Sequence, residues 1–147
     1  MKLLVSRCLL GEPCRYDGRS VPSEGVLRLE EEGHILIPVC PEVEGGLSTP
    51  RPPAERQPDG RVVNREGQDV TVQYRAGAEI ALARARREGC SAAIMKAKSP
   101  SCGNGCIYDG TFSRRLTAGQ GVTAALLTEA GIPVFSEEQL DRLKELD

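Results

Sequence analysis

Several kinds of residue are scarce in this chain of 147 residues. It has no tryptophan, only three tyrosines and two phenylalanines, and a single histidine. That histidine cannot complete the paired histidines of a zinc finger, and no C-x-x-C pair is present. No apolar run approaches the roughly 20 residues that a membrane-spanning helix needs. We therefore expect neither a zinc finger nor a membrane segment.

An excess of positive charge is also missing. Lysine and arginine number 19 against 21 acidic residues, which gives a formal net charge of −2. Binding to nucleic acid phosphates normally needs a basic surface. Nucleic acid is thus an unlikely partner unless another chain supplies a helper domain. The apolar part of the N-terminus is too short for a secretory signal, so we expect a cytoplasmic protein.

Short apolar runs alternate with segments of helical pattern along the whole chain. The pattern predicts strands over 2–6, 35–39, 92–95 and 132–135, and a small hairpin over 55–64. It predicts helices over 22–33, 69–88 and 121–129, and a last one that begins near Ser136. In the second helix we expect Ile80 and Leu82 to face inward. This alternation indicates an α/β fold: one domain over 1–147, with a mostly parallel Rossmann-like sheet and helices on both faces.

Six cysteines are the most informative residues. In a reducing compartment, clustered cysteines indicate metal binding or catalysis more often than disulfides. Cys8 follows the first predicted strand, Cys40 ends the second, and Cys102 lies in the Gly-rich loop after the third. The carboxyl ends of parallel strands share one edge of a sheet, where ligands bind. These three thiols are therefore expected to meet at one site, whereas a simpler interpretation makes them small buried residues.

The other cysteines are interpreted differently. Cys14 and Cys106 lie in the same loops as Cys8 and Cys102, and each is a fourth ligand or, as we favour, a bystander. Cys90 precedes a strand at the opposite end and is interpreted as structural. A weak internal repeat, C-x-Y-D-G, begins at Cys14 and again at Cys106, and we interpret it as two similar turns. Three thiolates without histidine suit an Fe–S cluster or, on ligand chemistry alone, zinc.

Three motifs, in order, resemble the thiouracil desulfidase family. The first is S-x-C-L-L-G-x-x-C-R-Y-D-G over 6–18. The second is P-V-C-P-E over 38–42, followed by G-G-L and P-R. The third is S-P-S-C-G over 99–103, followed by Y-D-G-T-F over 108–112. The resemblance covers essentially the whole chain.

This resemblance implies a cofactor and a reaction. The cofactor is an oxygen-sensitive [4Fe-4S] cluster that is held by Cys8, Cys40 and Cys102, with the fourth iron free. The reaction removes sulfur from a small-molecule thiolated pyrimidine such as 2-thiouracil and leaves the oxo base and hydrosulfide. By motif position, Glu42 and Ser101 correspond to the catalytic pair of the family.

Residue chemistry adds candidate substrate contacts. Arg51, in a Pro-rich loop, is placed to meet a pyrimidine carbonyl. Tyr16 and Tyr108 are the best candidates to contact a flat base because aromatic residues are scarce. Competing interpretations stay open: a non-catalytic metal or sulfur carrier that uses the same cysteines with zinc or an Fe–S cluster, and a plain α/β binding module with buried cysteines. A variant of the enzyme interpretation has thiolated RNA as the substrate.

Overall fold

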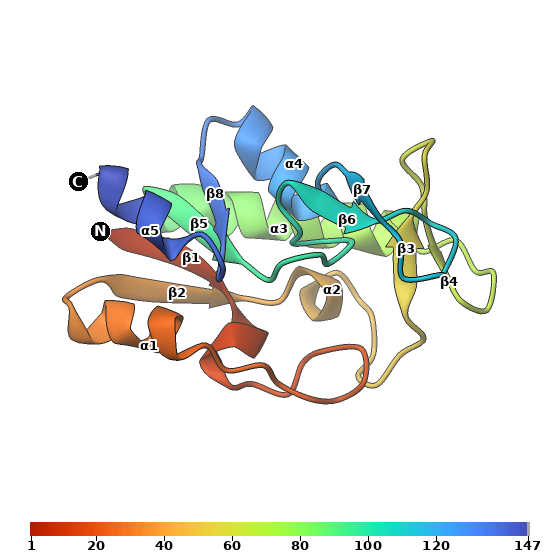
Figure 1. The fold of residues 1–147 in the computed structure, drawn as a ribbon, viewed down its shortest axis with the longest axis horizontal. Helices are drawn as coiled ribbons and strands as arrows, with labels where there is room; N and C mark the ends of the chain where they lie inside the picture. The colour runs from red at the N-terminus through yellow and green to blue at the C-terminus, as the bar shows by residue number, and fades with distance from the viewer. Residues whose placement is uncertain (147) are drawn as a thin grey trace.

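A computed structural model describes residues 1–146, and its centre is a four-stranded sheet (Figure 1). All neighbouring strands are parallel, in the order β2-β1-β5-β8. The strands are β1 (Lys2–Ser6), β2 (Ile35–Val39), β5 (Ala92–Met95) and β8 (Val134–Ser136). The predicted α/β class and parallel sheet are therefore confirmed.

Helices cover both faces of this sheet, as expected. One face packs on α1 (Glu24–Glu31) and α5 (Leu140–Leu143), and the other on α3 (Thr71–Glu88) and α4 (Val122–Glu129). Successive side chains of a strand point to opposite faces. In β1, Leu3 and Val5 accordingly join the core under α1, whereas Leu4 joins the core under α3.

The remaining elements are short, and all but the C-terminal one gather beyond the carboxyl ends of the strands. Figure 1 shows both chain ends on the left, with the small hairpins on the right. The elements are η1 (Arg7–Leu10), α2 (Pro41–Glu44), the antiparallel pair β3 (Ala54–Arg56) and β4 (Val62–Asn64), the antiparallel pair β6 (Cys106–Tyr108) and β7 (Leu116–Ala118), and η2 (Lys144–Leu146). Within residues 1–146, no helix is both long and apolar enough to span a bilayer.

Three details differ from the sequence-based expectation. Ile80 is exposed, because α3 presents its alanines to the sheet and leaves the larger side chain on the outer face. The C-terminal helix begins at Leu140, because Ser136 belongs to strand β8. The hairpin of β6 and β7 was not expected, since each strand has only three residues and shows no clear alternation.

Candidate metal centre and active site

A cavity of about 650 Å³ opens at the carboxyl-terminal edge of the sheet. Its floor comes from the ends of β1, β2 and β5, and its opposite wall comes from β3, β6 and the loop between β6 and β7. Cys8, Cys40 and Cys102 all line it, and each is 6–7% exposed. The structure therefore brings together three thiols that are far apart in the sequence, as their positions after three parallel strands predicted.

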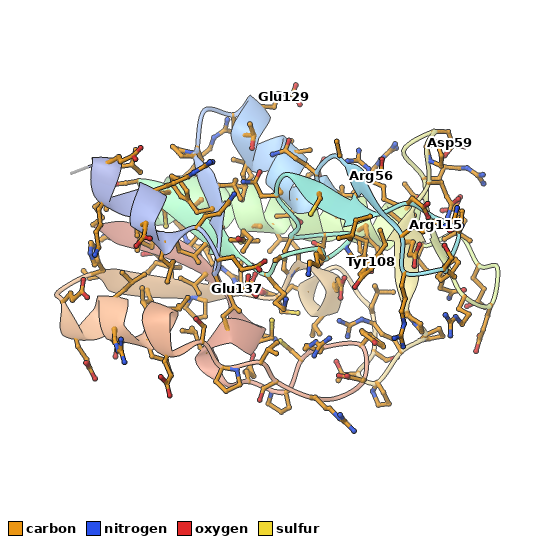
Figure 2. The ribbon with its side chains drawn as sticks, in the orientation of Figure 1. Arg56, Asp59, Tyr108, Arg115, Glu129 and Glu137 are labelled. Atoms are coloured by element: carbon orange, nitrogen blue, oxygen red, sulfur yellow. The ribbon has the colours of Figure 1, made fainter. Side chains whose placement is uncertain are left out.

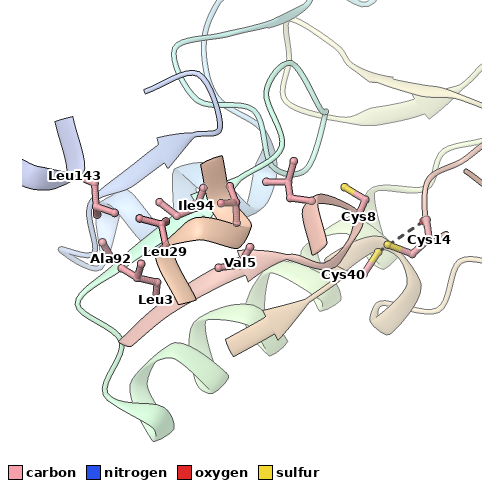
Figure 3. Close-up of a cluster of buried hydrophobic side chains, with 11 residues drawn as sticks. Leu3, Val5, Cys8, Cys14, Leu29, Cys40, Ala92, Ile94 and Leu143 are labelled. Carbon is pink, nitrogen blue, oxygen red and sulfur yellow. Dashed lines mark hydrogen bonds between the residues drawn. The ribbon is translucent and has the colours of Figure 1, made fainter. Parts of the chain in front are cut away.

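The remaining cysteines divide into two groups. Cys14 lines the same cavity and lies beside Cys40, whose thiol donates to the Cys14 carbonyl oxygen at 3.9 Å. Figure 3 shows Cys8, Cys14 and Cys40 at one end of a buried apolar cluster. Cys106 and Cys90 are not among the cavity-lining residues, and Cys90 packs against the core under α3. Four of the six cysteines are thus available to a ligand at this place.

The pKa values of the Cys14, Cys40 and Cys102 thiols are raised, so these three are protonated when no metal is bound. Burial raises the pKa of the Cys102 thiol to about 12. The contact with the Cys14 thiol, followed by burial, raises the pKa of Cys40 further. For Cys14, the contact with Cys40 lowers the pKa, but the contact with Cys8 and burial outweigh it, so the net shift is upward. Only a thiolate binds metal, so loading this site releases protons.

The donors that line the cavity are thiols, the ligands that hold iron–sulfur clusters. A four-iron cluster takes each cysteine at a separate corner, so its ligands need not converge on one ion. Among residues 1–146, no three side chains of Cys, His, Asp or Glu are grouped closely enough to hold a single ion. The only histidine, His34, lies elsewhere, beside the N-terminus.

Glu42 is held by two donors at the edge of the cavity. Its Oε1 accepts a hydrogen bond from the Tyr74 hydroxyl at 2.8 Å, and its Oε2 forms an ion pair with Arg51. Tyr74 is 2% exposed, and burial, together with the Glu42 charge, raises its pKa well above the usual value. Tyr74 therefore stays a neutral donor, and the carboxylate has a fixed orientation.

Close packing between α2 and α3 places Glu42 against Tyr74. A Cβ atom at Gly77 would lie 1.9 Å from the Pro41 carbonyl oxygen, and one at Gly45 would lie 2.1 Å from a backbone oxygen of α3. Both positions must be glycine for the two backbones to approach this closely. The short helix α2 thus carries the Cys40 thiol and the Glu42 carboxylate to the same edge of the cavity.

Arg51 lines the cavity, but most of its donors are used inside the protein. Its Nη1 donates to the Ser48 carbonyl and the Thr49 hydroxyl, and its Nη2 donates to the Cys14 carbonyl in addition to contacting Glu42. Its Nε is buried and has no partner within the described residues. Arg51 therefore acts mainly as an internal cross-link between its loop, the Cys14 backbone and Glu42.

Ser101 has a different setting from Glu42. Its hydroxyl is 0% exposed and lies 2.8 Å from the Thr123 hydroxyl of α4. It also contacts the Cys102 thiol, whose pKa it lowers slightly against the larger effect of burial. Ser101 is not among the lining residues, whereas its neighbour Ser99 is, with its hydroxyl accepting from the Cys102 N–H at 3.0 Å. The catalytic assignment of Ser101 stays a prediction.

The C-x-Y-D-G repeat forms two similar turns that both border the cavity. Asp17 accepts a hydrogen bond from the backbone N–H two residues on, and Asp109 does the same, each at 3.0 Å. Each turn ends in a glycine with positive φ. The tyrosine of each turn, Tyr16 or Tyr108, lines the cavity. Figure 2 labels Tyr108 at the end of β6. The structure places these predicted contacts together but leaves their role a prediction.

Positive side chains surround the mouth. Seven lysines and arginines line the cavity, against the two carboxylates of Glu42 and Glu55. Several are neutralised by carboxylates nearby, including Lys96, whose Nζ lies 3.0 Å from Glu137 (labelled in Figure 2). Within residues 1–146, no ion pair is present for Lys98, Arg65 or Arg114 among the lining cations. The mouth therefore favours neutral or negatively charged ligands over cations.

Sequence reasoning missed the residues that the hairpins and α3 contribute. Tyr74, Glu55 and Arg65 line the cavity but belong to none of the cysteine motifs, and Phe112 ends the third motif but was assigned no role. The scarcity of aromatic residues could have pointed to Tyr74 and Phe112.

Comparison with known proteins identifies the family of this chain. The 2-thiouracil desulfurase family matches residues 3–139. The chain belongs to the 2-thiouracil desulfurase family. The protein YbbK of Bacillus subtilis (strain 168) is 45% identical over 148 residues, which cover 95% of this chain and 97% of YbbK. A solved structure, the [4Fe-4S]-dependent thiouracil desulfidase TudS, is 50% identical with a TM-score of 0.91 and covers 99% of this chain and 96% of TudS. Membership in the desulfurase family confirms the resemblance that the three motifs indicated.

Proposed function

We propose that this protein is a [4Fe-4S]-dependent desulfidase that replaces the sulfur of a thiolated pyrimidine such as 2-thiouracil by oxygen. The observation that carries the proposal is the convergence of Cys8, Cys40 and Cys102 on one cavity, next to the Glu42 carboxylate. Family membership and the printed activity of TudS support it. The free thiols of all six cysteines suit a reducing compartment, so we also propose a cytoplasmic location.

Cys8, Cys40 and Cys102 would hold the cluster through their thiolates. When bound, a cluster with one iron free of protein ligands supplies a Lewis acid that polarises a soft thiocarbonyl group. Cys14 lies among these thiols, but we leave it outside the ligand set. Ser101 would then hydrogen-bond the Cys102 sulfur, as its contact with that thiol indicates.

Glu42 would move the protons of the reaction. Water would attack the thiocarbonyl carbon while one of its protons passes to a carboxylate oxygen of Glu42. Glu42 would then return that proton to the leaving sulfur as the carbon–sulfur bond breaks, and the new hydroxyl would lose its proton to form the carbonyl. The products are the carbonyl compound and hydrogen sulfide or its anion, so the reaction consumes water and no electrons. Tyr74 and Arg51 each occupy one carboxylate oxygen of Glu42, but an oxygen accepts a second hydrogen bond, which leaves room for the water.

The substrate would be a small molecule. Tyr16 and Tyr108 border the cavity from two matching turns, and Arg51 lines it beside Glu42, where we propose that it contacts a pyrimidine carbonyl. Because the mouth is rich in cations, a thiolated pyrimidine with a negatively charged substituent should be accepted at least as well as the free base. Comparing sulfide release from the two compounds at low and high salt tests this, since screening weakens only the charged contact.

The decisive experiment is anaerobic purification followed by iron and sulfide analysis. We expect about four irons per chain in the wild type and release of sulfide with uracil from 2-thiouracil. Cys8→Ser should lose the iron, whereas Cys106→Ser and Cys90→Ser, which change thiols outside the cavity, should keep both iron and turnover. Glu42→Gln should keep the iron and lose turnover. A wild type that holds the cluster but releases no sulfide from any thiolated pyrimidine would refute the enzyme assignment.

A non-catalytic metal or sulfur carrier would need the same cysteines but no fixed acid. Tyr74 and Arg51 orient the Glu42 carboxylate beside a ligand cysteine. A carrier would not need such an oriented carboxylate. A single zinc ion is disfavoured because the described side chains form no three-ligand group for one ion. These observations favour the enzyme.

A further inference from the structure

Aromatic residues are concentrated at the cavity. The chain has three tyrosines and two phenylalanines, and four of these five residues line the cavity as described over residues 1–146. The exception, Phe135, packs against the core under α1. Stacking on a flat ligand needs an aromatic ring, so the concentration of the few aromatic residues at the cavity favours a flat ligand there.

Backbone strain is concentrated there as well. Over residues 1–146, only three residues other than glycine have positive φ: Lys98 at 67°, Phe112 at 56° and Arg114 at 63°. All three line the cavity. A left-handed backbone is unfavourable for a side chain with a Cβ atom, and most of all for a bulky one. Such residues persist where the surroundings hold them, and they cluster at binding sites.

Glu55 holds Phe112 in this conformation. Its Oε1 accepts hydrogen bonds from the Gly110 N–H at 2.9 Å and from the Phe112 N–H at 3.1 Å. Glu55 is only 9% exposed, so these charge-assisted bonds are shielded from water. The base of the loop is closed by the Asp109 N–H, which donates to the Arg115 carbonyl at 2.9 Å. The position of Phe112 is therefore determined by β3 and by its own loop.

One face of the Phe112 ring carries a cation. The Arg65 guanidinium carbon lies 5.7 Å from the ring centroid. A planar cation over one face supports the ring, and a stacked flat group would use the opposite face. The side chain is only half-buried, so apolar burial does not account for the strained backbone.

We propose that Phe112 is the surface on which the pyrimidine ring of the substrate stacks, with Glu55 as the positioning residue. This inference rests on the proposed desulfidase function and assigns its base-binding wall. Tyr74 is occupied by its hydrogen bond to Glu42, and Tyr16 is 41% exposed at the rim. Phe112 has no hydroxyl to satisfy, so stacking is the interaction its ring offers inside a polar cavity.

Matched substitutions separate stacking from packing. Phe112→Leu keeps an apolar side chain and the same backbone strain but removes the ring, whereas Phe112→Tyr keeps the ring. Calorimetric binding of uracil to the cluster-loaded protein should weaken on the order of ten- to a hundredfold in Phe112→Leu, since a base–aromatic contact is worth about 1–3 kcal/mol. Phe112→Tyr should bind within a few-fold of the wild type. Equal affinity in Phe112→Leu and the wild type overturns the proposal.

The other phenylalanine gives the control. Phe135→Leu removes a ring from the core, so it should lower the melting temperature and leave uracil affinity unchanged. Phe112→Leu should weaken uracil binding and leave the melting temperature unchanged.

Glu55→Ala should raise the KM for 2-thiouracil more than it lowers kcat, because it frees the loop and leaves Glu42 in place. A change in kcat alone would contradict the positioning role.

A fluorescent probe reads the contact directly. The chain has no tryptophan, so Phe112→Trp introduces a single tryptophan, whose emission can be excited separately from that of the three tyrosines. Its emission in the loaded protein should fall as uracil binds, while that of Phe135→Trp stays constant. Unchanged emission at saturating uracil overturns the stacking assignment. If the wild type binds uracil and releases sulfide but Phe112 variants behave like it, only this inference fails; if the wild type does neither, the proposed function fails with it.

Discussion

The ion pair of Glu42 and Arg51 gives the sharpest prediction. The two side chains are 14% and 5% exposed, so water compensates little for a lost partner. Removing one member of a buried ion pair costs about 3–5 kcal/mol, because the other charge stays buried and unpaired. We expect Arg51→Met to lower the free energy of unfolding by about 3 kcal/mol, near the lower limit, since Glu42 keeps its bond from Tyr74. For a chain of this length that corresponds to a melting temperature roughly 6–12 °C lower.

Glu42→Gln should cost less. Arg51 keeps its three uncharged acceptors, which are the carbonyl oxygens of Ser48 and Cys14 and the Thr49 hydroxyl. In the double variant, the unpaired carboxylate is gone, so the cost of Arg51→Met should shrink. We expect a coupling free energy of about 1–3 kcal/mol between the two sites, in the range of residues in direct contact.

Urea unfolding of the wild type, both single variants and the double variant measures this coupling under anaerobic conditions. The slopes of the unfolding curves must agree, since a changed slope would signal a change in compactness rather than in stability. Additive effects within about 0.5 kcal/mol would show that the two side chains do not interact and would remove Arg51 as the support of Glu42.

Three further predictions concern the surroundings of this pair. Gly77→Ala should lower the urea midpoint and reduce turnover, because its Cβ would meet the Pro41 carbonyl, whereas Glu79→Ala on the exposed side of α3 should change neither. Above about pH 10 the free energy of unfolding of the wild type should fall with rising pH more steeply than that of Tyr74→Phe, by up to about 1.4 kcal/mol per pH unit. The reason is that the raised pKa keeps Tyr74 protonated in the folded protein, whereas Tyr74 ionises in the unfolded chain. Equal slopes in the two proteins would contradict the buried hydrogen bond to Glu42. Removing iron with a chelator should lower the melting temperature of the wild type but not of Cys8→Ser, because a group that binds only the folded state stabilises it.

The sequence was sufficient for the parts of this protein that depend on regular patterns. Cys8, Cys40 and Cys102 each follow an apolar strand, and parallel strands bring their carboxyl ends to one edge. That argument needs only the order of the elements. The same reasoning placed Cys90 at the opposite end, where it packs against the core.

Other parts depend on contacts that no local pattern encodes. The exposure of Ile80 follows from how closely α3 approaches the sheet through its alanines, which is a property of the packed pair of layers. Ser101 carries a motif position, yet its hydroxyl pairs with Thr123 on a helix that begins about twenty residues later. The partnership of Tyr74 with Glu42 joins two helices through residues that lie 32 positions apart in the chain.

Those long-range contacts have one feature in common, and it explains how the site is built. The three cysteines come from segments that follow strands of the sheet, whereas Tyr74, Glu55 and the Phe112 loop come from elements outside it. The sheet fixes where a metal group would lie, and the outer elements determine what is held against it. Substitutions in the outer elements should therefore change substrate affinity and turnover while iron content stays constant. Substitutions among the three cysteines should change iron content first, and activity only as its consequence.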